Sequence, residues 1–512
     1  MLASRYSDSV LDKLLELNAI RNICKAFLKP SDVDDDGNLV KENGMHYWLA
    51  SDDALHTMSS TTETGRPRSW NPNILNLPTY NHGRLGAGIK YIVDLRASQK
   101  VESKDENGNI VEKSRLPEFM QKYTEIKPKN YPTMRSIAMA RPGWCMPEAD
   151  LQTAEMRGLA FLSGDRKLLK MLLEPDECWA KVDPKYVPEG IDPGECVVRI
   201  GFPDYIHLPA DKEKYLLTYA SDKVIHAKFT EDQLLRDENG KIVSPKFDMH
   251  WGVVELSRGT VREELNKKKD RGAGKVVNFS SSYGGQAPSL ARKIEADTGT
   301  KPEIEDVEAM LEAIKRRQPR ATEWFEELEQ VPKTTGKLVA KSGRIRHCHT
   351  FKDIGSSLSY RTREGVITAL GRECRNFFLQ ESVAAVAARA LKNMVDMHIK
   401  FGLKGYPCVC LYDSIVVHCP WEERTIWGKA LELYMYLANG WYYDERVLRY
   451  AIDLEYNAGW STAPDKEYNE QLKDPNFHPT PPHLKYVEQW LDNMIKLYTD
   501  NPKLSVYNVE DL

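Results

Sequence analysis

One stretch of the sequence, RGAGKVVNFSSSYGG at 271–285, sets two cationic and two aromatic side chains at intervals of four residues. On an α-helix this spacing stacks side chains on one face, so Arg271, Lys275, Phe279 and Tyr283 are predicted to form a single stripe, which the two closing glycines end. A ligand that fits the stripe has a polyanionic end and a flat apolar end, as a nucleoside triphosphate has. The alternative is a surface helix with scattered charges.

The length and composition allow a large buried core. The chain has 512 residues, 41% of them hydrophobic, and is expected to divide into roughly two to four structural units. It has no run of about 18 or more apolar residues and no signal-peptide pattern, which predicts a soluble intracellular protein. The nine cysteines are scattered, which favours reduced thiols.

Net charge does not by itself indicate a nucleic-acid partner, since 71 lysines and arginines stand against 75 acidic residues. Nucleic-acid binding would have to come from local basic patches. The candidates are NKKKDRGAGK (266–275), KRRQPR (315–320) and KSGRIRH (341–347). Each patch alone is more often a solvated face.

Two aspartates stand where predicted strands end, which makes them candidates for metal binding. Asp413 lies between the apolar runs CVCLY and IVVHC, a pattern that predicts a hairpin with a carboxylate at its tip. Asp150 lies where the predicted strand GWCMPEA meets the predicted helix LQTAEMRGLAFLSGD. Such carboxylates can hold the two magnesium ions, about 3.5–4 Å apart, that phosphoryl transfer uses. The alternatives are a turn-capping aspartate and a helix N-cap.

Asx-Gly pairs indicate hairpin turns. DVDDDGNLVKEN (32–43) imitates the start of a calcium-binding loop, but Asn43 stands where a bidentate glutamate is needed, so an acidic hairpin turn is preferred. DENGN (105–109) and DENGK (237–241) repeat the same turn chemistry. The CVC and HCH tripeptides lack a matching ligand set, so core and surface roles are preferred to a zinc site.

Seven blocks of the sequence follow one another in an order that a known family shares. They are TGRPRSWNPNILNLP (64–78), DLQTAEMRGLAFLSGD (150–165), DMH (248–250), RGAGKVVNFSSSYGG (271–285), GRIR (343–346), RECRNFFLQESVAA (372–385) and LYDS (411–414). They resemble the TGR…NPNLQNIP block, motif A, the DIH block, motif B, the GRxR loop, the RxxxNxxxQ helix and motif C of family A DNA polymerases. That family contains bacterial DNA polymerase I and phage replicative enzymes.

The resemblance implies roles for the 271–285 helix, which belongs to the fingers in that family. Arg271 and Lys275 would hold the triphosphate, with help from His250. Phe279 and Tyr283 would border the sugar and base of the incoming nucleotide, and Tyr283 would leave its place when a templating base enters.

The resemblance also implies a reaction, the addition of deoxynucleotides to a primer 3'-end. Asp150 and Asp413 would carry two Mg²⁺ ions, and Glu155 would lie beneath the sugar and exclude a 2'-hydroxyl. The positions that match duplex-binding residues are Arg66, Asn76, Arg344, Arg372, Asn376 and Gln380. The implied partners are primer-template DNA and deoxynucleoside triphosphates, without a membrane.

The sequence departs from the family pattern at five positions. Tyr412 and Ser414 stand where motif C usually has a histidine and a glutamate, which leaves two metal carboxylates in the matched motifs. Thr153 and Leu75 replace glutamines of motif A and of the first block. Phe378 replaces a proline in the 372–385 helix.

The fold class that the resemblance implies is α+β, a right-hand polymerase with an antiparallel-sheet palm, helical fingers and a largely missing thumb. The expected parts are an N-terminal region with a remnant thumb helix (1–60), the first part of the palm (61–174) with an insertion (80–135), a second insertion (175–246), the fingers (247–335), the second part of the palm (336–470) and a C-terminal extension (471–512). A second polypeptide carrying the thumb, a 3'-5' exonuclease or both is expected, as in a split phage replicative enzyme in the cytoplasm of an infected bacterium.

Two other functions fit parts of the pattern. A single-subunit RNA polymerase shares the palm carboxylates and a similar fingers helix, but Glu155 and the NPNILNLP block argue against it. A catalytically weak or inactive relative that acts as a DNA-binding subunit would have no use for Asp150 and Asp413 together with Arg271 and Lys275. Primer extension with deoxy- or ribonucleotides distinguishes the three.

Overall fold

A computed structural model describes most of the chain. The described residues are 32–33, 39–41, 57–70, 75, 83–104, 110–114, 116, 121, 124–125, 135, 138–173, 178–187, 197–200, 216–218, 224–226, 231–237, 240, 242–243, 249–259, 265–331, 334–347, 360–443, 446–460, 466–474 and 476–505. Two compact units divide the chain. The first consists of Met1–Gln152, Val386–Asn439 and Ala451–Leu504, and the second of Thr153–Ala385, Gly440–Tyr450 and Ser505–Leu512. The domain limits given above stay predictions.

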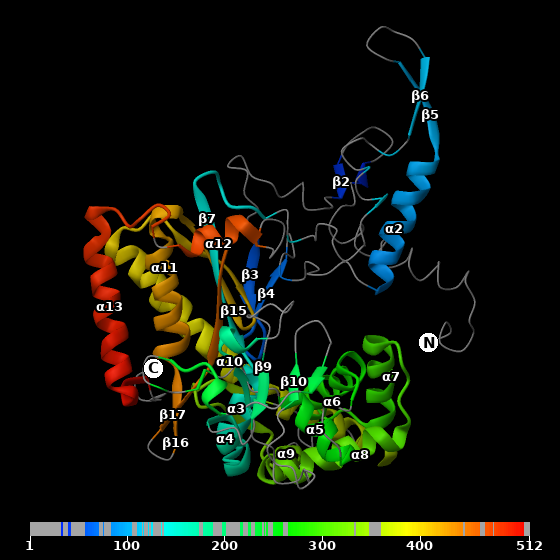
Figure 1. Cartoon of the computed structure of the whole chain (residues 1–512). Helices are drawn as coiled ribbons and strands as arrows, with labels where there is room; N and C mark the ends of the chain where they lie inside the picture. Colours follow the sequence, from blue (N-terminus) through cyan, green and yellow to red (C-terminus); the bar gives the residue numbers. More distant parts are fainter. Residues whose placement is uncertain are drawn as a thin grey trace. The chain divides into compact units, whose positions relative to one another are not determined.

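A four-stranded antiparallel sheet is the centre of the first unit (Figure 1). Its strands, in spatial order, are β14 (Tyr406–Leu411), β15 (Ser414–Pro420), β7 (Trp144–Gln152) and β18 (Ala451–Asn457). All seven residues of β15 are buried, as expected of a central strand rich in β-branched side chains. Pro407 lies in β14 at the sheet edge beside a bulge, where its missing N–H group is tolerated.

The β14–β15 hairpin confirms the predicted hairpin with a carboxylate at its tip. Leu411 pairs with Ser414, so Tyr412 and Asp413 form a two-residue loop. Tyr412 has a φ of 53°, the left-handed conformation that such tight loops demand. Tyr412 packs with Leu411 in a small apolar cluster that also contains Val416. The loop backbone is therefore held by both turn geometry and packing.

Helices cover this sheet and carry the C-terminal part of the unit. They are α11 (Arg424–Leu431), the π-helix η14 (Glu432–Leu437), α12 (Lys466–Lys473) and α13 (Lys485–Asp500). Helix α11 packs on β7 and β15, and Lys429 of α11 pairs with Glu488 and Asp492 of α13 at 3.3 and 2.6 Å. A Cβ atom on Gly428 would lie 1.8 Å from the Tyr456 hydroxyl, so only glycine allows α11 to approach β18 this closely.

A fully buried guanidinium joins α11 to the segment around α12. Arg424 is 1% exposed. Its Nε donates to the Leu472 carbonyl at 2.8 Å, and Nη1 donates to the carbonyls of Trp421 and His478 at 2.8 and 2.7 Å. Nη2 donates to the Asp474 carbonyl. A single side chain therefore satisfies backbone acceptors from three separate stretches of the C-terminal part.

The second unit is mainly helical. Its helices are α3 (Ala154–Ser163), α4 (Arg166–Leu173), α5 (Met249–Arg258), α6 (Gly272–Ser282), α7 (Ala287–Thr298), α8 (Ile304–Arg317) and α9 (Pro319–Gln330). One core, with Val253, Val277 and Leu290, holds α5 to α8 together. A second, with Leu159, Phe325 and Phe377, joins α3, α9 and α10 (Tyr360–Phe401). The predicted helical character of 247–335 is confirmed for the described residues.

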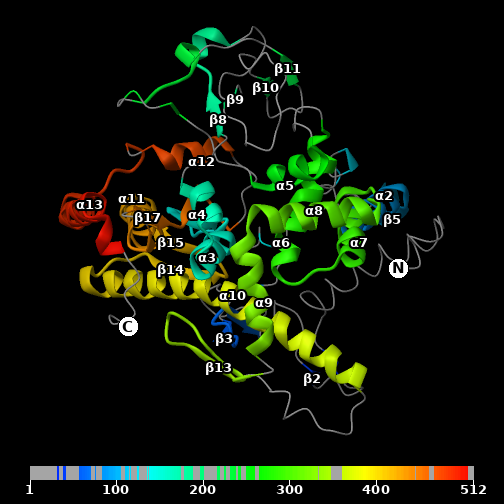
Figure 2. The same ribbon diagram turned by 90° about the horizontal axis from the view of Figure 1, so that it is seen from below.

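The long helix α10 (Tyr360–Phe401) contributes residues to both units and begins before the 372–385 block that resembles a family helix (Figure 2). The additional turns include two glycines, which weaken the helical pattern in the sequence. A two-stranded hairpin, β12 (Lys337–Val339) and β13 (Ile345–His347), carries the basic KSGRIRH patch.

The structure supports the turn predictions where it describes them. Strand β1 (Asp32–Val33) pairs with β2 (Leu39–Lys41), and β5 (Lys100–Lys104) pairs with β6 (Ile110–Ser114), both antiparallel. At the third site the Gly240 N–H group donates to the Asp237 carbonyl at 2.9 Å. The predicted helix near residues 9–28 lies outside the described residues.

Both regions that were expected as insertions contain regular structure. Helix α2 (Gly83–Ser98) accompanies the β5–β6 hairpin, and 175–246 contains an antiparallel meander. Its strands are β8 (Cys178–Lys181), β9 (Val197–Ile200), β10 (Leu216–Thr218) and β11 (Val224–His226). Cys145, Cys374, Cys408, Cys410 and Cys419 are free thiols. Among the described residues, no helix is long and apolar enough to cross a bilayer. The mixed helical and antiparallel-sheet content agrees with the predicted α+β class.

Replacing Arg424 by alanine is expected to lower the free energy of unfolding of the first unit by about 3 kcal/mol or more, because several buried carbonyls lose a charged donor. Chemical denaturation measures this change, and limited proteolysis should show earlier cleavage near α12. The exposed Arg141 of the same unit is the control, with an expected cost below about 1 kcal/mol for the alanine variant. Equal stability of the two variants would contradict the role of Arg424.

Candidate active site

Carboxylates gather on one face of the sheet in the first unit. Asp150 of β7 is directly opposite Ser414 of β15 and Asp453 of β18, and Glu148 of β7 is directly opposite Glu455 of β18. Directly opposed residues share a face, and so do residues two apart on one strand. Glu148, Asp150, Asp453 and Glu455 therefore lie on the same face, in two rows across the strands.

The structure brings Asp413 to the end of this group. The Asp413 carbonyl accepts a hydrogen bond from the Leu151 N–H group at 2.9 Å, which joins the β14–β15 loop to β7 beside Asp150. Asp150 and Asp413 therefore lie close together, and their role as metal ligands stays a prediction. Asp150 is a strand residue and not a helix N-cap, since Thr153, with a φ of 49°, occupies the N-cap of α3.

The electrostatics of this face favour a cation. Burial, followed by the charges of Asp413, Glu148, Asp453 and Glu455, raises the pKa of Asp150 to about 7. Crowded carboxylates of this kind resist ionisation until a positive charge compensates them. A divalent cation at Asp150 and Asp413 would relieve the repulsion, so the donor set fits a hard, oxygen-binding metal such as Mg²⁺. Among the described residues, no group of three or more histidines, cysteines, aspartates and glutamates is arranged to hold a metal.

Ser414, which occupies the place of a family glutamate, binds a carboxylate from the neighbouring strand. Its Oγ donates to Glu148 Oε1 at 2.6 Å. Burial raises the pKa of Glu148, and the Ser414 hydrogen bond opposes that rise. Glu148, Asp453 and Glu455 were not among the predicted site residues. The signal was the spacing of two in PEAD and DLE, which puts both acids of each strand on one face.

The stripe of 271–285 forms on and around α6. The π-helix η11 (Lys267–Arg271) precedes α6, so Arg271 is the last residue of a π-turn and Tyr283 is the C-cap of the helix. Arg271, Lys275, Phe279 and Tyr283 keep exposed surface, whereas the intervening apolar residues are buried. The predicted stripe is confirmed, with its two ends at the helix termini.

A buried acid fixes the π-turn before Arg271. Asp270 Oδ1 pairs with Arg258 Nη1 of α5 at 3.1 Å, and Asp270 Oδ2 accepts from the Asn266 N–H group at 2.7 Å. Asn266 Oδ1 in turn accepts from the Lys269 N–H group at 3.0 Å. These bonds join the end of α5 to the start of the stripe.

His250 lies against α6, as the predicted assistance to Arg271 and Lys275 requires. Its Nδ1 lies 3.4 Å from Asn278 Nδ2, and its ring centroid lies 5.5 Å from that of Phe279. A Cβ atom on Gly274 would lie 2.3 Å from the His250 carbonyl oxygen, so glycine is required where α5 crosses α6. The close crossing places His250 one turn from Lys275.

The structure describes five of the six predicted duplex-binding residues. Arg372, Asn376 and Gln380 lie at intervals of four on α10 and are half-buried, and Arg344 is exposed in the β12–β13 hairpin. In the first unit, the Arg66 guanidinium lies 5.3 Å from the ring centre of Tyr412, next to Asp413. The sixth residue, Asn76, lies outside the described residues. Glu155 lies in the first turn of α3 and is half-buried.

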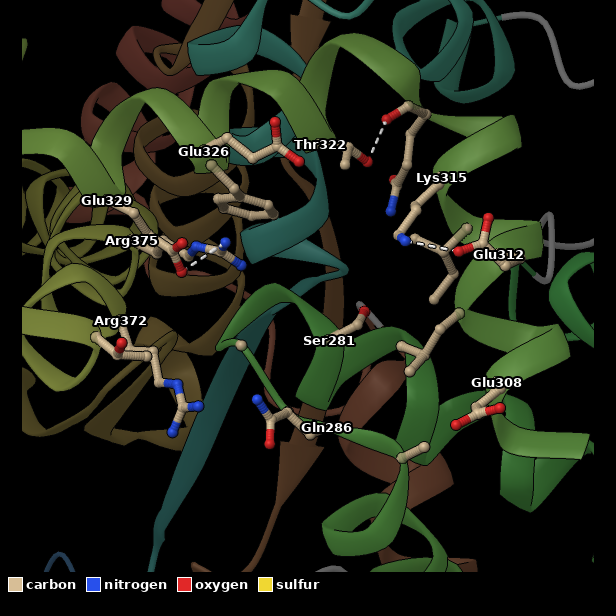
Figure 3. A pocket seen from close by; sticks show the side chains of 18 of the residues that line it. Ser281, Gln286, Glu308, Glu312, Lys315, Thr322, Glu326, Glu329, Arg372 and Arg375 are labelled. Carbon is tan, nitrogen blue, oxygen red and sulfur yellow. Dashed lines mark hydrogen bonds and ion pairs between the residues drawn. The ribbon is translucent and has the colours of Figure 1, made fainter. Parts of the chain in front are cut away.

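A cavity of about 760 Å³ in the second unit opens where the stripe ends (Figure 3). Gly284, which follows Tyr283, lines it together with the side chains of Arg372 and Arg375 from α10. Arg375 is engaged, since it pairs with Glu329 at 2.7 Å and lies 4.8 Å from the ring centre of Phe325. The cavity thus has a mixed lining, in which four glutamates, Glu308, Glu312, Glu326 and Glu329, accompany the basic residues and the ring.

Comparison with known proteins identifies similar sequences and structures. No family model matches the sequence. The DNA polymerase of Bacillus phage SP01 is 24% identical over 176 residues, which are 34% of this chain and 18% of the phage protein. The match therefore spans less than a fifth of that relative. Among solved structures, the POL domain of Pol1 from M. smegmatis, in complex with DNA primer-template and dNTP, is 17% identical, with a TM-score of 0.48 over 81% of this chain and 50% of that chain.

Neither comparison bears on the expected second polypeptide, which stays a prediction. The similarity to a phage DNA polymerase agrees with the resemblance that the seven sequence blocks indicate.

Proposed function

We propose that the chain is a template-directed DNA polymerase that adds deoxynucleotides to a primer 3'-end. The observation that supports this best is the pair Asp150 and Asp413, brought together at the end of two adjacent strands on a face rich in carboxylates. Such a pair is costly for the fold without a cation, and it belongs to the blocks that resemble polymerase motifs A and C. We place the activity in the cytoplasm of a phage-infected bacterium.

Two Mg²⁺ ions are the proposed cofactor, held by Asp150 and Asp413. When bound, they supply charge stabilisation for an in-line displacement at the α-phosphate. Glu148 and Asp453 contribute negative potential next to Asp150, which favours cation binding. The Ser414 hydroxyl keeps the Glu148 carboxylate in place without neutralising it.

The residues of the stripe hold the nucleotide in this proposal. Arg271 and Lys275 bind the triphosphate oxygens, Arg as a fork and Lys as a point charge, and His250 donates a further hydrogen bond. Phe279 and Tyr283 border the sugar and base. The Asp270–Arg258 pair keeps the π-turn fixed, so Arg271 needs little reorganisation when the triphosphate arrives.

Primer-template DNA is bound by Arg66, Asn76, Arg344, Arg372, Asn376 and Gln380. The arginines contact phosphates, which gives affinity without sequence preference. Asn376 is half-buried, and its Oδ1 has no hydrogen-bond partner among the described residues. Glu155 selects deoxynucleotides by occupying the space that a 2'-hydroxyl needs.

Replacing Asp150 or Asp413 by alanine is expected to reduce single-nucleotide addition by roughly a thousandfold or more, because the metal ions lose a ligand. Rapid-quench primer extension measures the rate, and fluorescence anisotropy with primed DNA should give a nearly unchanged Kd. Asp396→Ala, which removes an exposed carboxylate paired with Lys392, is the matched control with a normal rate. Normal rates in both active-site variants would refute the metal assignment.

Glu155→Ala is expected to lower the preference for deoxy- over ribonucleotides by roughly 10- to 100-fold, because the carboxylate no longer excludes the 2'-hydroxyl. The ratio of kcat/KM values for the two nucleotides is the measurement. Glu305, which also lies in the first turn of a helix of the second unit, provides the control variant. A preference that stays unchanged in Glu155→Ala would show that another group selects the sugar.

A further inference from the structure

Arg344 lies on a turn that a serine organises. Ser342 Oγ accepts a hydrogen bond from the Arg344 N–H group at 3.3 Å. The Gly343 N–H group donates to the Ala340 carbonyl at 3.0 Å, and Ala340 N–H donates to the Arg344 carbonyl at 2.9 Å. Gly343 has a φ of +83°, which this turn requires. The backbone of Arg344 is therefore fixed locally while its side chain remains exposed.

Two carboxylates of α10 hold this turn and its hairpin, which lies beside α10 in Figure 2. The Ser342 hydroxyl donates to Glu381 Oε1, and Arg346 Nη2 pairs with Glu373 Oε2 at 2.8 Å. Glu381 is 4% exposed, whereas the Glu373 side chain is 52% exposed. Exposed ion pairs contribute little, so the buried Glu381 link dominates the attachment.

The attachment runs along the polar stripe of α10. Glu373 and Glu381 follow Arg372 and Gln380 directly in the sequence, eight residues apart, so the two attachment points form a row that runs beside the Arg372–Gln380 stripe. Docking the hairpin at both points adds the exposed Arg344 to the surface that the stripe presents.

We propose that Glu381 is a positioning residue for primed DNA: through Ser342 it holds Arg344 beside the α10 stripe, where Arg344 contacts the duplex backbone. The inference rests on the proposed function and deepens its DNA-binding surface. A buried carboxylate is costly for the fold, and a neutral side chain would fill the same space at less cost. Glu381 is therefore explained better by what it holds than by packing.

The electrostatics of Glu381 are consistent with this role. Burial raises the pKa of Glu381, and the Ser342 hydrogen bond and the Arg344 charge oppose that rise. The Arg344 guanidinium is thus close enough to interact with the Glu381 charge. A carboxylate can both orient Ser342 and attract Arg344, whereas an uncharged acceptor can do only the first.

A double-mutant cycle tests the inference. The variants are Arg344→Ala, Glu381→Ala, Glu381→Gln and the double variant Arg344→Ala/Glu381→Ala. Fluorescence anisotropy gives the Kd for a primed template at several salt concentrations. We expect Arg344→Ala to weaken binding about tenfold and to reduce the salt slope by about one. Glu381→Ala should weaken binding several-fold, and the double variant should bind no more weakly than Arg344→Ala.

The amide variant separates the two parts of the role. In Glu381→Gln the amide oxygen can still accept the Ser342 hydrogen bond, so this variant should keep most of the affinity. If the fold-increase in Kd of the double variant equals the product of the two single fold-increases, Glu381 acts independently of Arg344. That result would overturn the inference. A normal Kd for Arg344→Ala would also overturn it, and this result would count against the proposed duplex contact of Arg344 itself.

The controls separate positioning from folding. Asp396→Ala removes a carboxylate from the same helix without touching the hairpin and should leave the Kd and the salt slope unchanged. The Tm of each variant shows whether it is folded. Ser342→Ala breaks the link from the hairpin side and should reproduce the Kd of Glu381→Ala. A Ser342→Ala variant with normal Kd would contradict the proposed link.

Discussion

In the central sheet of the first unit, like charges lie directly opposite one another, and the rest of the unit has to compensate for their repulsion. Asp150 faces Asp453, and Glu148 faces Glu455, across adjacent antiparallel strands. Such pairs destabilise a sheet. The structure compensates on the same strands, because β15 is buried along its whole length and packs beneath α11. Apolar burial thus stabilises the sheet, whereas the face that carries the four carboxylates does not.

In the second unit, a close backbone contact and not a set of charges determines where the site residues lie. The crossing of α5 and α6 is so close that residue 274 must be glycine. This contact sets His250 against Phe279, and the Asp270–Arg258 pair fixes the turn before Arg271. Buried bonds therefore position the groups proposed to bind a nucleotide, of which His250 is itself buried while Arg271, Lys275, Phe279 and Tyr283 keep exposed surface.

The sequence predicted what depends on local spacing. Intervals of four revealed the α6 stripe, and two apolar runs around Asp413 revealed the hairpin. The acids on β18 were missed because their place beside Asp150 depends on strand register, which is set by residues roughly three hundred positions away. The π-turn before Arg271 was missed for a different reason, since π-bulges have no pattern of their own in the sequence.

Two serines make contacts that a position-by-position comparison of sequence motifs does not reveal. Ser414 replaces a family glutamate, yet its hydroxyl holds Glu148 from the next strand, so an acid still lies 2.6 Å from the Ser414 oxygen. Ser342 holds Glu381 in the same way. A hydroxyl can donate to a carboxylate without cancelling its charge, whereas an arginine or lysine would neutralise it. Burial raises the pKa of both carboxylates and each serine hydrogen bond opposes that rise, beside the proposed metal site for Glu148 and beside the proposed DNA contact for Glu381.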